Sequence, residues 1–64
     1  MEKILLNRIR CKHCNDIITS EHRHDYVMCH CGKVSVDGGK MYLKRGFQTS
    51  PEEDYEELSQ IQKD

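Results

Sequence analysis

Four cysteines form two close pairs in this chain of 64 residues, and their thiol groups are the side chains best suited to chemistry. Cys11 and Cys14 are separated by two residues, Cys29 and Cys31 by one, and fourteen residues lie between the pairs. Two close pairs at such a distance are the pattern of a tetrahedral site in which four thiolates hold one zinc ion. Because four protein ligands leave no open coordination position, we expect one structural Zn²⁺.

The residues that follow each pair favour two tight turns, or knuckles, around the metal. Asn15 and Gly32 come directly after the second cysteine of each pair, and Asn and Gly most easily adopt the left-handed backbone that such turns require. The second pair is unusually tight, so other sites stay open. His24 is near enough in sequence to replace Cys29 or Cys31, the thiols could form a redox dithiol or disulfide, or the metal could be iron.

Outside the cysteines, the polar cluster best suited to binding or catalysis is His22-Arg23-His24-Asp25. A His-Asp pair can transfer protons, and a His-Arg pair can bind phosphate. The favoured interpretation is structural: these side chains tie a loop by hydrogen bonds or support the knuckles. No nucleophile stands at a recognisable spacing, and Asp37-Gly38-Gly39 fits a hairpin turn better than a phosphate loop. We therefore expect no enzymatic activity.

The size of the chain indicates that it needs stabilisation beyond its hydrophobic core. A chain this short buries only about 60% of its unfolded surface, and small domains usually need a disulfide, a metal or a partner. No segment reaches the roughly 20 apolar residues of a membrane span, nor the apolar run of a signal peptide. We therefore expect a cytoplasmic protein, where clustered cysteines bind metal more often than they form disulfides.

Charge is divided unevenly along the chain. Residues 1–49 carry nine Lys/Arg and five Asp/Glu, whereas residues 50–64 carry one Lys and six Asp/Glu. We accordingly divide the chain into a zinc-ribbon domain at 1–49 and an acidic C-terminal helix or tail at 50–64. If the basic side chains share one face, they could bind nucleic acid, with Tyr42 or Phe47 stacked on a base: Arg8, Arg10, Lys12, Lys33, Lys40, Lys44 and Arg45.

Short strand-like runs surround the cysteines. They cover residues 4–9, 16–20, 26–28, 33–37 and 40–45. The last two flank Gly38-Gly39, which predicts a β-hairpin because glycine supplies the positive φ of tight hairpin turns. In the returning strand we expect Met41 and Leu43 on one face and Tyr42 on the other.

The C-terminal segment carries the signals of a helix start. Ser50 can cap the helix, Pro51 suits its first position, and Glu53 completes a capping box. An apolar stripe then follows at a spacing of three residues, which we expect to pack on the ribbon, to contact a partner or a second copy, or to stay disordered in isolation: Tyr55, Leu58 and Ile61. The expected fold is a small, metal-stabilised, β-rich zinc ribbon of two knuckles plus β-hairpins, with a C-terminal α-helix.

Several segments together make a specific motif: Arg-Cys-Lys-His-Cys at 10–14, His-Asp-Tyr-Val-Met-Cys-His-Cys-Gly at 24–32, Val-Ser-Val-Asp-Gly-Gly at 34–39 and Tyr-Leu-Lys-Arg at 42–45. With the tail at 51–58, they resemble a family of small uncharacterised zinc-ribbon-like proteins of bacteriophages, prophages and Gram-positive bacteria. The resemblance implies an accessory protein in the cytoplasm of a host cell. It implies no particular activity.

Three functions are consistent with these patterns. The first is a non-enzymatic zinc-binding interaction module that binds a host or phage protein through the hairpin, the acidic helix or both. The second is a nucleic-acid-binding zinc ribbon that uses its basic face. The third is an oligomeric protein that sequesters a small phosphorylated ligand with His22, Arg23, His24 and nearby Lys residues. The residues expected to contact a ligand or partner are His22, Arg23, His24, Asp25, Lys40, Tyr42, Lys44 and Arg45.

Overall fold

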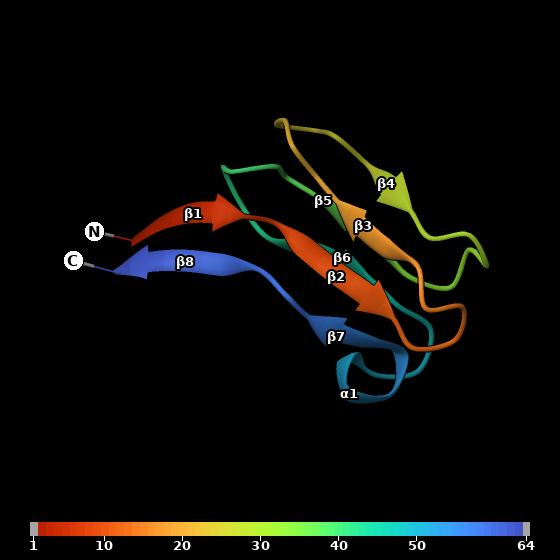
Figure 1. Ribbon diagram of the computed structural model, residues 1–64. Helices are drawn as coiled ribbons and strands as arrows, with labels where there is room; N and C mark the ends of the chain where they lie inside the picture. The colour runs from red at the N-terminus through yellow and green to blue at the C-terminus, as the bar shows by residue number, and fades with distance from the viewer. Residues whose placement is uncertain (1, 64) are drawn as a thin grey trace.

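Three small antiparallel sheets make up the fold in the computed structural model, which describes residues 2–63 (Figure 1). The elements, in chain order, are β1 (Glu2–Leu6), β2 (Arg8–Cys11), β3 (Ile17–Thr19), β4 (Val27–Met28), β5 (Ser35–Asp37), β6 (Lys44–Gly46), α1 (Pro51–Asp54), β7 (Tyr55–Glu57) and β8 (Gln60–Lys63). The sheets have the strand orders β1-β8, β3-β2-β7 and β4-β5-β6. The prediction of a small β-rich fold is confirmed.

The core lies between the sheet β3-β2-β7 and the sheet β4-β5-β6. In β2 the buried residues alternate, so Ile9 and Cys11 point inward while Arg8 and Arg10 are half-buried. β3 and β7 flank β2 in register, with Ile18 beside Ile9 and Tyr55 beside Cys11. The buried apolar side chains are Ile9, Cys11, Ile18, Cys29, Val34, Val36 and Tyr55. Since two of these seven are cysteines of the predicted site, the metal site and the core are continuous.

The hairpin predicted around Gly38-Gly39 forms, but its second strand starts later than expected. β6 pairs with β5 through Val36 and Arg45, and residues 38–43 form the loop. The Gly38 carbonyl accepts hydrogen bonds from the N–H groups of Met41 and Tyr42, so this stretch is a closed turn rather than strand. The expected strand over residues 41–43 is therefore wrong, although exposure alternates there as predicted, with Met41 and Leu43 exposed and Tyr42 half-buried.

The expected C-terminal helix is wrong beyond its first turn. Ser50 caps α1 by accepting the Glu53 N–H at 3.1 Å, and Pro51 begins the helix as predicted. At Tyr55 the backbone becomes extended, with φ −149° and ψ 162°. β7 then pairs with β2, and β8 pairs with β1. An isolated helix of this length is marginal, whereas strand pairing satisfies the open edge of β2 and buries Tyr55 in the core.

This change of structure also removes the predicted helical stripe. Tyr55 is buried, Leu58 is half-buried in the connection between β7 and β8, and Ile61 is exposed in β8. The three side chains therefore do not share one helix face.

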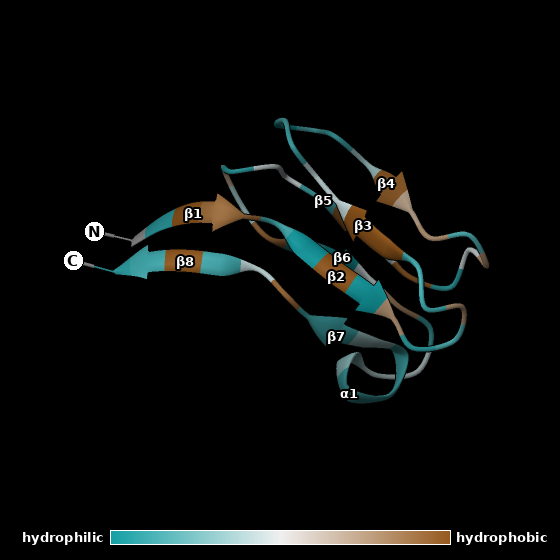
Figure 2. Cartoon of the chain, in the orientation of Figure 1, coloured by the Kyte–Doolittle hydropathy of each residue, from teal (hydrophilic) through white to brown (hydrophobic). Residues whose placement is uncertain are grey.

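β1 and β8 form a two-stranded arm that extends from the two larger sheets (Figure 1). Ile4 lies opposite Ile61 in the register of the arm, and Figure 2 shows a hydrophobic stretch in each of its two strands. Within residues 2–63, no helix is long and apolar enough to cross a membrane.

A buried amide joins segments that are distant in sequence. Asn7 is 1% exposed, and its Nδ2 donates to the carbonyls of Asp37, Gly39 and Tyr42 at 3.1, 2.9 and 3.3 Å. Its Oδ1 accepts a hydrogen bond from Arg45 Nη1 at 2.7 Å. Asn7 thereby fixes the hairpin loop against the junction of β1 and β2.

Arg45 links the hairpin to the C-terminal strands. Its guanidinium donates to both carboxylate oxygens of Glu57 and to Ser59 Oγ, and its side chain is 9% exposed. A bidentate Arg–carboxylate pair is geometrically specific, so this contact fixes the segment after β7 against β6.

Replacing Asn7 tests the importance of this network. Asn7→Ala leaves buried carbonyl groups without a donor, so we expect the free energy of unfolding to fall by about 2–3 kcal/mol. Chemical denaturation of the metal-loaded protein measures the change. Gln62→Ala removes an exposed amide of the same chemistry, and it should change stability by less than about 0.5 kcal/mol. An equally small loss of unfolding free energy in Asn7→Ala and Gln62→Ala would show that the Asn7 network contributes nothing to stability.

Candidate metal centre

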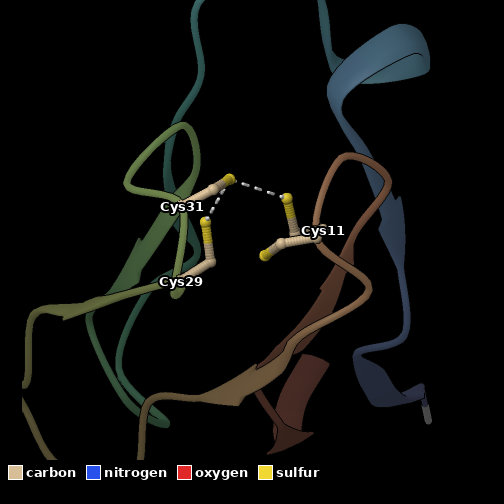
Figure 3. Close-up of side chains that lie close together, drawn as sticks. Cys11, Cys29 and Cys31 are labelled. Atoms are coloured by element: carbon tan, nitrogen blue, oxygen red, sulfur yellow. Dashed lines mark hydrogen bonds between the residues drawn. The ribbon is translucent and has the colours of Figure 1, made fainter.

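Two turns on opposite sides of the core deliver the four cysteines to one point. Cys11 ends β2, and Cys14 lies in the turn that follows it, whereas Cys29 and Cys31 lie in the connection between β4 and β5. Figure 3 shows the sulfur of Cys11 facing those of Cys29 and Cys31. All four sulfur atoms lie within 4.8 Å of one another. The predicted convergence of the two pairs is confirmed.

The spacing of the sulfur atoms fits one metal ion at their centre. The distances from Cys31 Sγ to Cys11 Sγ and Cys29 Sγ are 3.6 and 3.5 Å. A tetrahedral ion with metal–sulfur bonds of about 2.3 Å sets its ligands about 3.8 Å apart. A disulfide requires about 2.05 Å, and all four cysteines are free. The arrangement therefore matches a metal site better than a disulfide.

Both knuckles have the backbone geometry predicted from the sequence. Asn15 and Gly32 have φ values of 62° and 77°. The N–H of Asn15 donates to the carbonyl of Cys11 at 2.9 Å, and the N–H of Gly32 donates to the carbonyl of Cys29 at 3.0 Å. In the first knuckle the His13 N–H also points at Cys11 Sγ, at 3.4 Å. Such N–H donors stabilise a thiolate.

The close approach of the four sulfurs gives the cysteines different pKa values. Burial raises the pKa of Cys29, but hydrogen bonds from the backbone of Val34 and from the neighbouring thiols lower it to about 6. A hydrogen bond from the backbone of Lys33 lowers the pKa of Cys31, whereas burial and the three neighbouring sulfurs raise it to about 12. The first thiol of the site therefore loses its proton easily, whereas the last thiol loses its proton with difficulty. A divalent cation at the centre would offset this repulsion.

Asp54 supports the first knuckle from α1. Its carboxylate is nearly fully buried and accepts hydrogen bonds from the N–H groups of Gln48 and Thr49, at 2.9 and 2.6 Å. His13 Nε2 lies 2.8 Å from Asp54 Oδ1. The hydrogen bond with His13, followed by that from Thr49, lowers the pKa of Asp54 to about 2. Because the folded pKa lies below the ordinary 3.8, this stabilisation is present above pH 4 and is lost between pH 4 and 2.

Asp16 connects the two knuckles directly. Its Oδ2 accepts the backbone N–H of His30 at 3.0 Å, and its own carbonyl accepts the N–H of Cys11 at 2.9 Å. Neither Asp16 nor Asp54 was predicted as a supporting residue from the sequence. The position of Asp16, directly after the Cys-x-x-Cys-Asn turn, could have indicated its role. The neighbouring sequence does not indicate the contact of Asp54 with His13, which is 41 residues away.

The polar loop at 22–25 lies apart from the sulfur cluster and is tied by its own hydrogen bonds. Asp25 Oδ2 accepts the N–H of Glu21, and the Asp25 carbonyl accepts the hydroxyl of Ser20. His24 has a positive φ of 65°, and its Nδ1 lies 3.2 Å from Tyr42 Oη. Within residues 2–63, the close group of candidate metal ligands contains the four cysteines and no histidine.

The remaining predicted contact residues lie on the surface or in the hairpin. His22, Arg23 and Lys40 are exposed, as is Lys44 in β6. Tyr42 is half-buried in the hairpin loop. The structure therefore brings His24 and Tyr42 together but does not gather the whole predicted set at one point.

A matched pair of substitutions separates the cysteine ligand set from one with a histidine. Cys31→Ala removes one of four converging sulfurs, so we expect zinc affinity to fall by at least about 100-fold. His24→Ala should leave the affinity unchanged, because its ring lies against Tyr42. Competition with a chromophoric chelator measures both. Loss of zinc from His24→Ala, with retention in Cys31→Ala, would assign a ligand role to the histidine.

Comparison with known proteins assigns the chain to a family without a described activity. A family model described as a domain of unknown function (DUF7695) matches residues 3–47, which include all four cysteines and the hairpin loop. No curated protein and no solved structure gives a significant match. Since the family model covers more than half of the 64 residues, this chain belongs to the DUF7695 family.

Proposed function

We propose that this protein is a non-enzymatic, zinc-binding interaction module that binds a host or phage protein in the cytoplasm. The observation that carries the proposal is the closed set of four sulfurs, all within 4.8 Å of one another. Four protein ligands complete a tetrahedral zinc site, so no position is left for a substrate or an activated water. The metal then stabilises the fold, and function belongs to the surface.

Zinc suits this site better than iron because nothing about the site requires electron transfer. Zn²⁺ has no redox chemistry, and four-thiolate zinc sites commonly hold small ribbon folds together. The two knuckles, joined through Asp16 and His30, are consistent with a zinc ribbon. The phage or prophage setting implied by the sequence resemblance is part of this proposal.

The hairpin loop at 38–43 is the surface we propose for the partner. Met41 is 64% exposed and Leu43 is 37% exposed, with Lys40 and Lys44 exposed beside them in sequence. Asn7 fixes the backbone of this loop at Gly39 and Tyr42, so the loop presents apolar side chains from a rigid support. Rigid apolar anchors with a charged surround are typical of protein-binding sites.

The alternative of a nucleic-acid-binding face has less support. Arg10 pairs with Glu56 and Arg45 pairs with Glu57, while Lys12 Nζ donates to the carbonyl of Glu52. The acidic C-terminal segment therefore lies against part of the basic set and reduces its charge. Binding to phosphates requires several uncompensated cations on one face.

Capture from the lysate of a Gram-positive bacterium tests the proposed surface. We expect the zinc-loaded protein to enrich a specific partner, and Met41→Asp to reduce that enrichment at least about tenfold by placing a charge in an apolar contact. Ile17→Asp is the matched control, because Ile17 is an exposed apolar residue, 56% accessible, in β3. Quantitative mass spectrometry of the captured proteins gives the readout.

Two results would contradict the proposal. One is the absence of any protein enriched over a bead-only control. The other is a partner that both aspartate variants retain equally, which would place the contact away from the hairpin loop.

A further inference from the structure

A hollow of about 380 Å³ lies beside the junction of β1 and β2, away from the sulfur cluster. Figure 1 shows the turn between β5 and β6 close to this junction, and the hydrogen bond from Asn7 to the Gly39 carbonyl confirms the contact. The volume falls in the range of small-molecule sites. Its lining includes Leu5, Leu6, Arg8, Glu21, His22 and Lys40.

The walls of the hollow come from three separate segments that buried polar groups hold in place. Ser20, which is 2% exposed, accepts the N–H of Gly39 at 2.9 Å and donates to the carbonyl of Asp25 at 2.7 Å. Gly39 has φ 52°, and a Cβ there would lie 2.4 Å from the carbonyl of His22. Only glycine permits this approach, which brings Lys40 and His22 to the same hollow.

The lining of the hollow includes two cationic side chains and one imidazole. The Nε–H of Arg8 donates to Thr19 Oγ1 at 2.8 Å, which orients the guanidinium. Within residues 2–63, its two terminal nitrogens make no hydrogen bond and can take another acceptor. Lys40 supplies an exposed ammonium, and His22 supplies an exposed imidazole. Glu21 is the carboxylate among the lining residues. The two permanent cations therefore outnumber the acid.

We propose that this hollow binds a small phosphate monoester with an apolar portion, such as a nucleoside monophosphate. Arg8, His22 and Lys40 would bind the phosphate oxygens, since guanidinium and ammonium groups form strong charge-assisted hydrogen bonds with phosphate. Leu5 and Leu6 would contact the apolar portion. From the sequence we expected a phosphorylated ligand at His22, Arg23, His24 and nearby lysines; of these, His22 and Lys40 line the hollow. The hollow adjoins the hairpin loop proposed as the protein contact, because Lys40 belongs to both.

Titration of the zinc-loaded, full-length protein with adenosine monophosphate tests this site. We expect amide resonances of residues 5–8, 19–22 and 39–41 to shift in two-dimensional NMR spectra. Inorganic phosphate should bind more weakly because it lacks the apolar portion, and adenosine should not bind because it lacks the phosphate. Lys40→Gln should weaken binding of the monophosphate about tenfold.

The control variant is Lys33→Gln, which removes an exposed lysine of the second knuckle that does not line the hollow. It should bind the monophosphate as the unaltered protein does. Absence of shifts up to about 10 mM ligand, a concentration at which even millimolar affinity is visible, would overturn the proposal. Shifts that map to other residues, or equal weakening by Lys33→Gln, would overturn it too.

Discussion

The convergence of four cysteine sulfurs on one point is the constraint on which the rest of this structure depends. The sulfurs lie within 4.8 Å of one another, so all four can be ionised together only with a cation between them. Cys11 and Cys29 also belong to the buried hydrophobic cluster, whose other members are Ile9, Ile18, Val34, Val36 and Tyr55. We therefore expect the binding of a metal and the packing of the core to be coupled.

Polar side chains do much of the work that a larger hydrophobic core would do in a longer chain. Asn7 and Asp54 are each 1% exposed and bind backbone groups of the hairpin loop and of the segment before α1. Arg45 extends this network to Glu57 and Ser59. In a chain of this size, where the buried apolar area is small, such bonds fix the positions of the surface loops. Asn7 in particular holds the loop that we propose as a protein contact and one wall of the hollow.

The sequence was informative where the signal was local. The cysteine spacing, with Asn15 and Gly32 after the pairs, predicted the knuckles and their left-handed backbone. The glycines at 38 and 39 predicted a hairpin, although the loop is longer than expected because the turn closes onto Gly38 and Asn7.

The sequence failed where structure depends on distant partners. Ser50, Pro51 and Glu53 do start a helix, but it ends after one turn since β7 pairs with β2, more than forty residues earlier in the chain. The supporting role of Asp54 was hidden for the same reason, because its partner His13 is remote in sequence. The residue spacing within 50–64 indicates neither the pairing of β7 with β2 nor the contact of Asp54 with His13.

The most direct test of the central claim is native mass spectrometry combined with an NMR spectrum before and after metal removal. We predict one zinc ion per chain and a dispersed amide spectrum for the loaded protein. Chelation should collapse that dispersion, and one equivalent of zinc should restore it. A protein that is metal-free as purified under reducing conditions, yet gives a fully dispersed spectrum, would contradict the dependence of this fold on its four-sulfur site.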